Sequence, residues 1–209
     1  MQCIKGDVVE SLSKETSNEE EFVRHEVEFS VIFRLQHWIR VLAITVLIIS
    51  GFYLAYPMLS QVHTDEPTNF MYALFRSWHV IFGFVFISAL IVKIYIFFFG
   101  KLEARERQSF RDVFSLNAWI RQIGYYLLLC KRPKLRGAYN PLQFVSYFVF
   151  YLLSIALIVT GLILYVHVYH EGLGGFLYEP MKAIEVMLGG LAVVRELHHI
   201  LMWAVLIFI

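Results

Sequence analysis

The sequence has little charge and little cysteine. Charged residues are 17% of the 209 residues and hydrophobic residues are 58%, whereas a soluble domain has about 25% charged and about 45–50% apolar residues. This composition excludes an ordinary soluble fold, and we expect no nucleic-acid partner. The formal net charge of +1 says little by itself, because in a membrane protein the placement of Lys and Arg matters more than their sum. Cys3 and Cys130 form no CxxC pair, so a disulfide framework or a cysteine-ligated metal site is not supported. The first thirty residues are polar, so we expect no signal peptide.

Long apolar stretches dominate the rest of the sequence. A hydrocarbon core about 30 Å thick needs about 20 apolar residues in a helix that crosses it. Three stretches qualify outright, and a fourth is still apolar where the sequence stops. We therefore predict an all-α membrane bundle of four transmembrane helices. The predicted spans are residues 33–56, 75–99, 142–167 and 187–209.

The fourth span is expected to be truncated. Arg195 and Glu196 should lie at an interface, because a charge at the centre of a span costs about 2.5–3.5 kcal/mol. From Leu197 onward the chain reaches only about 20 Å into a core about 30 Å thick. We expect the chain to end inside the membrane and part of the natural C-terminus to be missing.

Basic residues gather in one connection between spans. The loop at 100–141 carries nine Lys and Arg residues, whereas segments 57–74 and 168–180 carry none. The positive-inside rule therefore places this loop and the N-terminal tail, residues 1–32, in the cytoplasm. Within the loop, apolar residues from Trp119 to Cys130 recur at helical spacing, which predicts an interfacial helix.

Four of the eight histidines fall in or at the predicted spans, where ionisable residues are costly and indicate function. Because successive spans are antiparallel, His37 lies at the cytoplasmic side, and His79 and His198 enter from the opposite side. The latter two can face each other at one depth, as two axial ligands of a single haem require. His37 has no visible partner at its own depth. His199 lies about 100° around the helix from His198, so both cannot point at one iron.

Positions fourteen residues apart share a helix face at depths about 21 Å apart. Gly51 follows His37 at this spacing and would let a second macrocycle approach the first span, although glycine also serves plain helix contact. Lys93 follows His79 in the same way and is a candidate partner for a haem propionate, although it can instead snorkel to the interface. Arg40 is a candidate for stabilising a semiquinone or a propionate, or for a positive-inside anchor.

Other interpretations of the histidines remain open. Each can instead hydrogen-bond a backbone carbonyl or a lipid headgroup. A small transporter would use such histidines for ions or protons, and a purely structural anchor would not need them. Four histidines are expected to be solvated: His25, His63, His167 and His170.

Short motifs occur in a specific order from about Glu28 to the end of the sequence. They are Arg34-Leu35-Gln36-His37-Trp38, Gly51-Phe52, Arg76 to His79, Val92-Lys93-Ile94-Tyr95, Lys131-Arg132-Pro133, Asn140-Pro141, Thr160-Gly161, His198 and Met202-Trp203. Together they resemble the b-type cytochrome subunits of membrane-bound nickel–iron hydrogenases. The resemblance implies four or five transmembrane helices that carry two b haems.

The same resemblance implies roles for particular residues. His37 matches a ligand of the cytoplasmic-side haem, while His79 and His198 match the pair for the other haem. The remaining ligand is expected at position 212, beyond this sequence, so one haem site would be incomplete. Two positions depart from the family pattern: Lys93 stands where arginine is usual, and Tyr139 where histidine precedes Asn-Pro.

The implied function is electron transfer rather than catalysis by this chain alone. Electrons from hydrogen would pass from a periplasmic nickel–iron large subunit through an iron–sulfur small subunit and haem b to quinone in the bacterial inner membrane. The nearest alternative is the cytochrome b subunit of formate dehydrogenase or a similar oxidoreductase. The stretch Tyr139-Asn140-x-x-Gln143 resembles the quinone-pocket motif of those cytochromes. Asn140 and Gln143 are therefore quinone candidates; the alternatives are a loop cap and an interfacial amide.

Overall fold

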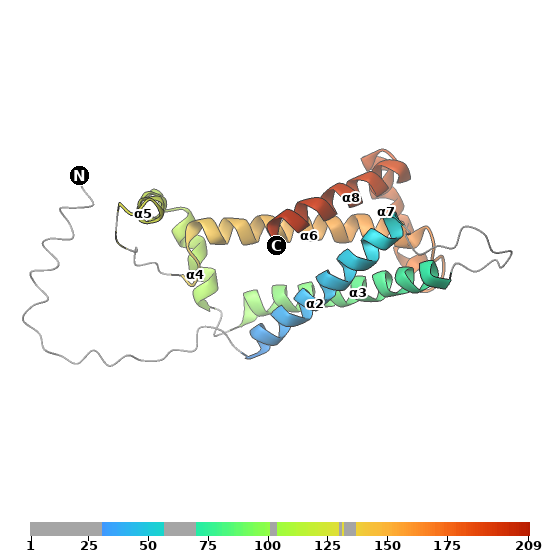
Figure 1. The fold of residues 1–209 in the computed structure, drawn as a ribbon, viewed down its shortest axis with the longest axis horizontal. Helices are drawn as coiled ribbons and strands as arrows, with labels where there is room; N and C mark the ends of the chain where they lie inside the picture. Colours follow the sequence, from blue (N-terminus) through green and yellow to red (C-terminus); the bar gives the residue numbers. More distant parts are fainter. Residues whose placement is uncertain (1–30, 57–69, 101–103, 130, 132–136) are drawn as a thin grey trace, which may run out of the picture. The chain divides into compact units, whose positions relative to one another are not determined.

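The computed structural model describes residues 31–56, 70–100, 104–129, 131 and 137–209, and all its regular elements in these ranges are helices (Figure 1). The predicted all-α class is confirmed. The helices are α2 (Val31–Ala55), α3 (Phe70–Phe99), α4 (Ala104–Val113), α5 (Leu116–Tyr126), α6 (Pro141–Val166), α7 (Leu173–Leu188) and α8 (Leu191–Phe208). The predicted tail and the segment around His63 lie outside the described residues, apart from Val31 and Ile32.

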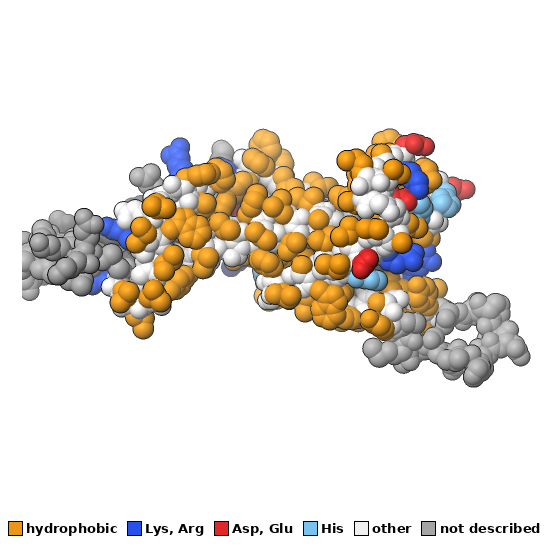
Figure 2. All heavy atoms as spheres, turned by 90° about the horizontal axis from the view of Figure 1, so that it is seen from above, with side chains coloured by type: hydrophobic (Ala, Val, Ile, Leu, Met, Phe, Trp, Pro, Cys, Tyr) orange, Lys and Arg blue, Asp and Glu red, His pale blue; other side chains and the backbone are white. Residues whose placement is uncertain are grey.

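Four of these helices, α2, α3, α6 and α8, are long and apolar enough to cross a membrane, with mean hydropathies between 1.7 and 2.5. At most 28% of the most apolar window of each span is buried against other protein atoms. Hydrophobic side chains cover much of the visible face of the described residues (Figure 2). Such exposure suits contact with lipid rather than water. The predicted multi-pass membrane protein is confirmed.

The element boundaries differ from the sequence predictions by more than two residues at two places. α3 begins at Phe70 rather than at residue 75. The predicted fourth span, residues 187–209, is divided, because Gly189 and Gly190 both adopt φ of +99° and separate α7 from α8. Such a φ is accessible to glycine and strained for other residues. α7 begins at Leu173, so segment 168–180, which was expected to be a loop, contains the start of a helix.

The chain forms two compact units, and unit 1 includes residues 95–147. In its described part, the helix predicted from Trp119 onward is present as α5, which ends at Tyr126 and on which Ile120 and Ile123 are exposed. The Trp119 ring nitrogen donates to the Val113 carbonyl at 2.8 Å, which joins α5 to the end of α4. α5 thus presents the apolar residues that a helix at a membrane surface needs.

Unit 2 comprises residues 32–94 and 148–209, which hold most of the four spans. Buried hydrogen bonds join three of them. Gln36 Nε2 donates to the Ala89 carbonyl at 2.8 Å, and Arg40 Nη1 donates to the Tyr151 hydroxyl at 2.6 Å. Toward the other end of α2, the Phe52 and Trp203 rings meet edge to face at 5.3 Å. These contacts hold α2 against α3, α6 and α8.

Candidate functional site

A cavity of about 900 Å³ lies among α2, α3, α6 and α8 inside unit 2. Its volume is in the range of small-molecule and cofactor sites, about 300–1,000 Å³. Most of the lining is apolar, and His79 and His198 are among the few polar side chains. The structure therefore brings together the two histidines that the antiparallel arrangement predicted to share one depth.

The two rings are spaced as axial ligands of one iron would be. Their centres lie 6.4 Å apart and their planes are inclined by 70°. Two imidazoles that share one metal through bonds of about 2 Å have ring centres roughly 6 Å apart. Among the described residues, no group of three or more His, Cys, Asp or Glu side chains is arranged to hold a metal ion. The pair therefore suits a metal whose other ligands come from a macrocycle, which is how haem is held.

A hydroxyl group orients each of these histidines. Ser50 Oγ lies 2.9 Å from His79 Nδ1, and Thr160 Oγ1 lies 2.9 Å from His198 Nδ1. The Ser50 hydroxyl donates to the Val46 carbonyl at 2.7 Å, and Thr160 donates in the same way within its own helix. Because each hydroxyl hydrogen is used, each oxygen accepts from Nδ1–H. This tautomer leaves the Nε2 lone pair available to a metal.

Glycines lie beside both rings. A Cβ atom added to Gly51 would lie 3.3 Å from His79 Cε1, and one added to Gly161 would lie 3.3 Å from His198 Cε1. Both glycines line the cavity. Each therefore leaves room on its helix for a histidine ring of the neighbouring span and for a large ligand next to it.

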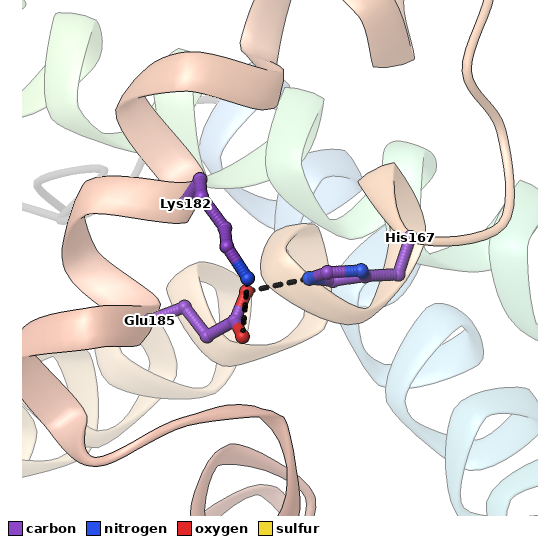
Figure 3. A network of polar contacts seen from close by, with 3 residues as sticks. All are labelled: His167, Lys182 and Glu185. Carbon is purple, nitrogen blue, oxygen red and sulfur yellow. Dashed lines mark hydrogen bonds and ion pairs between the residues drawn. The ribbon is translucent and has the colours of Figure 1, made fainter.

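Further polar side chains line the cavity. They include Arg76, Arg195, His199 and His167. His167, expected to be solvated, instead places Nε2 2.5 Å from Oε2 of the buried Glu185. Lys182 Nζ donates to the other Glu185 oxygen at 2.9 Å (Figure 3). These two hydrogen bonds, the Lys182 one foremost, lower the pKa of Glu185 below its ordinary value.

The other candidates on α2 and α3 lie outside this cavity. The His37 ring is exposed and meets Trp38 edge to face at 5.9 Å. Lys93 is buried, and its ammonium lies 4.2 Å from the centre of the Phe33 ring. Arg40 is buried too, and its Nε has no hydrogen-bond partner. Apart from His79, Gly51 is thus the one sequence-predicted candidate on α2 and α3 that lines the cavity.

Asn140 and Gln143 cap a helix in unit 1. Asn140 Oδ1 accepts from the Gln143 backbone N–H at 2.8 Å, and Gln143 Oε1 accepts from the Asn140 N–H at 3.3 Å. This reciprocal arrangement is a capping box at the start of α6. The Asn140 amide also donates to the Tyr126 hydroxyl at 3.1 Å. The cap that the sequence left open as an alternative is therefore present, and both residues remain quinone candidates.

Sequence reasoning missed the hydroxyl partners and the His167 contact. A repeated sequence pattern could have revealed the hydroxyl partners. Ser50-Gly51 and Thr160-Gly161 are both hydroxyl-glycine pairs in the second half of a span. No sequence signal links His167 to Glu185, because the contact depends on how α7 folds back.

Comparison with known proteins identifies the family. A family model described as prokaryotic cytochrome b561 matches residues 28–209. The chain belongs to the prokaryotic cytochrome b561 family. Membership confirms the resemblance found in the motifs, implies haem b as a cofactor, and makes the chain a membrane cytochrome b of electron transfer.

Curated relatives carry the name "Probable Ni/Fe-hydrogenase B-type cytochrome subunit". The one from Cupriavidus necator is 30% identical over 84% of this chain and 72% of its own length. That from Rhizobium leguminosarum bv. viciae is 27% identical over 96% of this chain and 84% of its own length. A similarly named subunit of hydrogenase 1 from Escherichia coli K12 is 32% identical over 68% of this chain and 61% of its own length.

Proposed function

We propose that this cytochrome b561 family member is the membrane subunit of a nickel–iron hydrogenase and delivers electrons from hydrogen oxidation to the quinone pool. The observation that carries the proposal is the His79–His198 pair, which faces across a cofactor-sized cavity. The relatives' names support hydrogenase as the partner enzyme. The chain would act within a hydrogen:quinone oxidoreductase complex rather than as an enzyme alone.

The residues of the cavity fit haem b. His79 and His198 would hold the iron through Nε2, because Ser50 and Thr160 engage both Nδ1 atoms. Gly51 would leave space for the macrocycle. When bound, haem supplies a one-electron redox couple at a fixed position. The mostly apolar lining suits the large apolar surface of the macrocycle.

A second haem is part of the proposal. It would use His37, which lies on α2 away from the first cavity. Two buried polar atoms on this helix, Gln36 Oε1 and Arg40 Nε, have no hydrogen-bond partner. Buried polar atoms without partners are costly, and a bound polar group is one way to satisfy them. Lys93 remains the candidate for a propionate of this haem.

Quinone would react on the cytoplasmic side. Asn140 and Gln143 are the candidates in unit 1, because their side-chain amides lie at the first turn of a span. Arg40 is a separate candidate in unit 2, where a buried guanidinium would stabilise a developing negative charge. Reduction of quinone also takes up protons, which would come from the cytoplasm. The positive-inside rule puts the basic loop on that same side.

The proposed assembly follows from this chemistry. An iron–sulfur small subunit would supply electrons from a nickel–iron large subunit, and the bilayer would be the bacterial inner membrane. The distribution of Lys and Arg in the sequence supports a cytoplasmic N-terminus. The cavity formed by His79 and His198 would then lie toward the periplasm, the side at which the small subunit would dock.

A difference spectrum tests the function. Membranes that contain the full chain with its partner subunits would be measured as hydrogen-reduced minus air-oxidised and as dithionite-reduced minus air-oxidised. We expect a b-type α band whose amplitude with hydrogen approaches that with dithionite. A band that appears with formate but not with hydrogen would move the chain to a formate dehydrogenase. No haem band at all would favour a histidine-bearing transporter.

A further inference from the structure

Two arginines line the same cavity as the histidine pair, one on α3 and one on α8. We propose that Arg76 and Arg195 each bind one propionate carboxylate of the haem held by His79 and His198. The inference rests on the proposed function, because it needs haem in this cavity. The proposal gives the haem site two anion-binding residues, which would hold the edge of the haem that carries its two propionates.

The helical register places the two arginines equivalently. Arg76 precedes His79 by three residues, and Arg195 precedes His198 by three residues. Side chains three apart lie on one helix face, about one turn from each other. Each arginine therefore lies on the cavity side of its helix, one turn toward the helix start from its histidine.

Both helix starts lie at the same end of unit 2. Tyr53, near the end of α2, stacks on Phe75, near the start of α3, with ring centres 4.1 Å apart. The first turns of α8 lie at the end of the unit where α2 and α6 finish (Figure 1). The two arginines are therefore displaced from the histidine pair in the same direction. A haem has both propionates on one edge, so the two cations match the two carboxylates in number and in side.

Neither arginine has a partner of its own within the described residues. None of the ion pairs or side-chain hydrogen bonds found there involves Arg76 or Arg195. The buried carboxylate of Glu185 already accepts from Lys182 and His167. Both guanidinium groups are therefore available to a ligand, and a carboxylate can accept two parallel hydrogen bonds from each. Arginine suits this geometry better than lysine does.

Binding of haem and of its dimethyl ester separates the carboxylate contact from iron ligation. The ester keeps the iron and the macrocycle but lacks both negative charges. The full chain would be produced with its partner subunits in haem-deficient cells, solubilised in detergent and titrated with each porphyrin. The variants are Arg76→Gln, Arg195→Gln and the double variant, with Arg76→Lys as the conservative change. Arg121→Gln is the matched control, because Arg121 is an exposed arginine on α5.

We expect wild-type protein and the Arg121→Gln control to bind haem more tightly than the ester, by roughly tenfold for each charge-assisted contact. Each single variant should lose part of this preference. At the His79–His198 site, the double variant should bind both porphyrins equally while it keeps a bis-histidine spectrum. Arg76→Lys should keep an intermediate preference. A double variant that retains the full preference would overturn the arginine assignment and leave the proposed function standing. Wild-type protein that binds neither porphyrin would overturn both.

Discussion

The His79 and His198 rings face each other with centres 6.4 Å apart, although they come from the second and the fourth spans. Residues of the other two spans, α2 and α6, hold the two rings in place. Ser50 on α2 holds His79, and Thr160 on α6 holds His198, both through Nδ1. All four spans of unit 2 therefore contribute to one two-ligand site. This arrangement gives direct expectations for variants of the supporting residues.

Ser50→Ala and Thr160→Ala should each raise the midpoint potential of the haem. A hydrogen bond from Nδ1–H makes the imidazole a stronger donor to iron and stabilises the oxidised state, so its loss favours reduction. Loss of about 1 kcal/mol from such a bond corresponds to a roughly fivefold change in the ratio of reduced to oxidised haem. Redox titration of the α band measures this ratio. Electron paramagnetic resonance should also show altered g values, because the ring is freer to rotate.

Ser50→Thr and Thr160→Ser are the matched controls, since both keep a hydroxyl. They should preserve the wild-type potential and g values. If the alanine variants leave the potential and the g values unchanged, the hydroxyl groups have no role in orienting the ligands.

The fold and the histidine pairing were accessible from sequence because they follow from one-dimensional rules. Runs of about 20 apolar residues predict spans, and antiparallel order places His79 and His198 at one depth. The split at Gly189 and Gly190 was missed, because the apolar pattern continues through it and only the backbone torsion reveals the break. Ser50 was missed for another reason. A serine in a span satisfies its own hydroxyl with a carbonyl one turn earlier, so Ser50 taken alone carries no signal, and only the matching Thr160-Gly161 pair could have pointed to its role.

Glu185→Gln should destabilise the protein near neutral pH and much less in acid. Hydrogen bonds from Lys182 and His167 hold the pKa of Glu185 below its ordinary value of 4.5. A lowered carboxyl pKa contributes stability that is complete above the unfolded value and disappears as the pH falls through the folded value. The melting temperature of the wild-type complex should therefore exceed that of the variant at pH 7, and the difference should shrink below about pH 4.5.

Glu179→Gln is the control for this prediction, because Glu179 is an exposed carboxylate on the same helix. It should leave the melting temperature nearly unchanged at both pH values. An equal loss in the Glu185→Gln and Glu179→Gln variants would contradict a specific role for the cluster in Figure 3.

Asn140→Ser should separate helix capping from quinone binding. Serine keeps an oxygen that accepts from the first turn of α6, but it lacks the amide that donates to Tyr126. Stability should therefore stay close to wild type. If Asn140 contacts quinone, reduction of haem by hydrogen should continue while reduction of a soluble quinone slows. Unchanged quinone turnover in a stable variant would remove Asn140 from the quinone site.

The most direct test of the account is the haem content of His79→Ala and His198→Ala, with His199→Ala as the control. Each complex would be purified with its partner subunits and measured by reduced minus oxidised spectra and by electron paramagnetic resonance. The account predicts that the first two variants each lose the low-spin bis-histidine signal of the same haem, while His199→Ala keeps it. A His79→Ala or His198→Ala variant with the full wild-type haem content and signal would contradict the assignment of these two histidines as axial ligands.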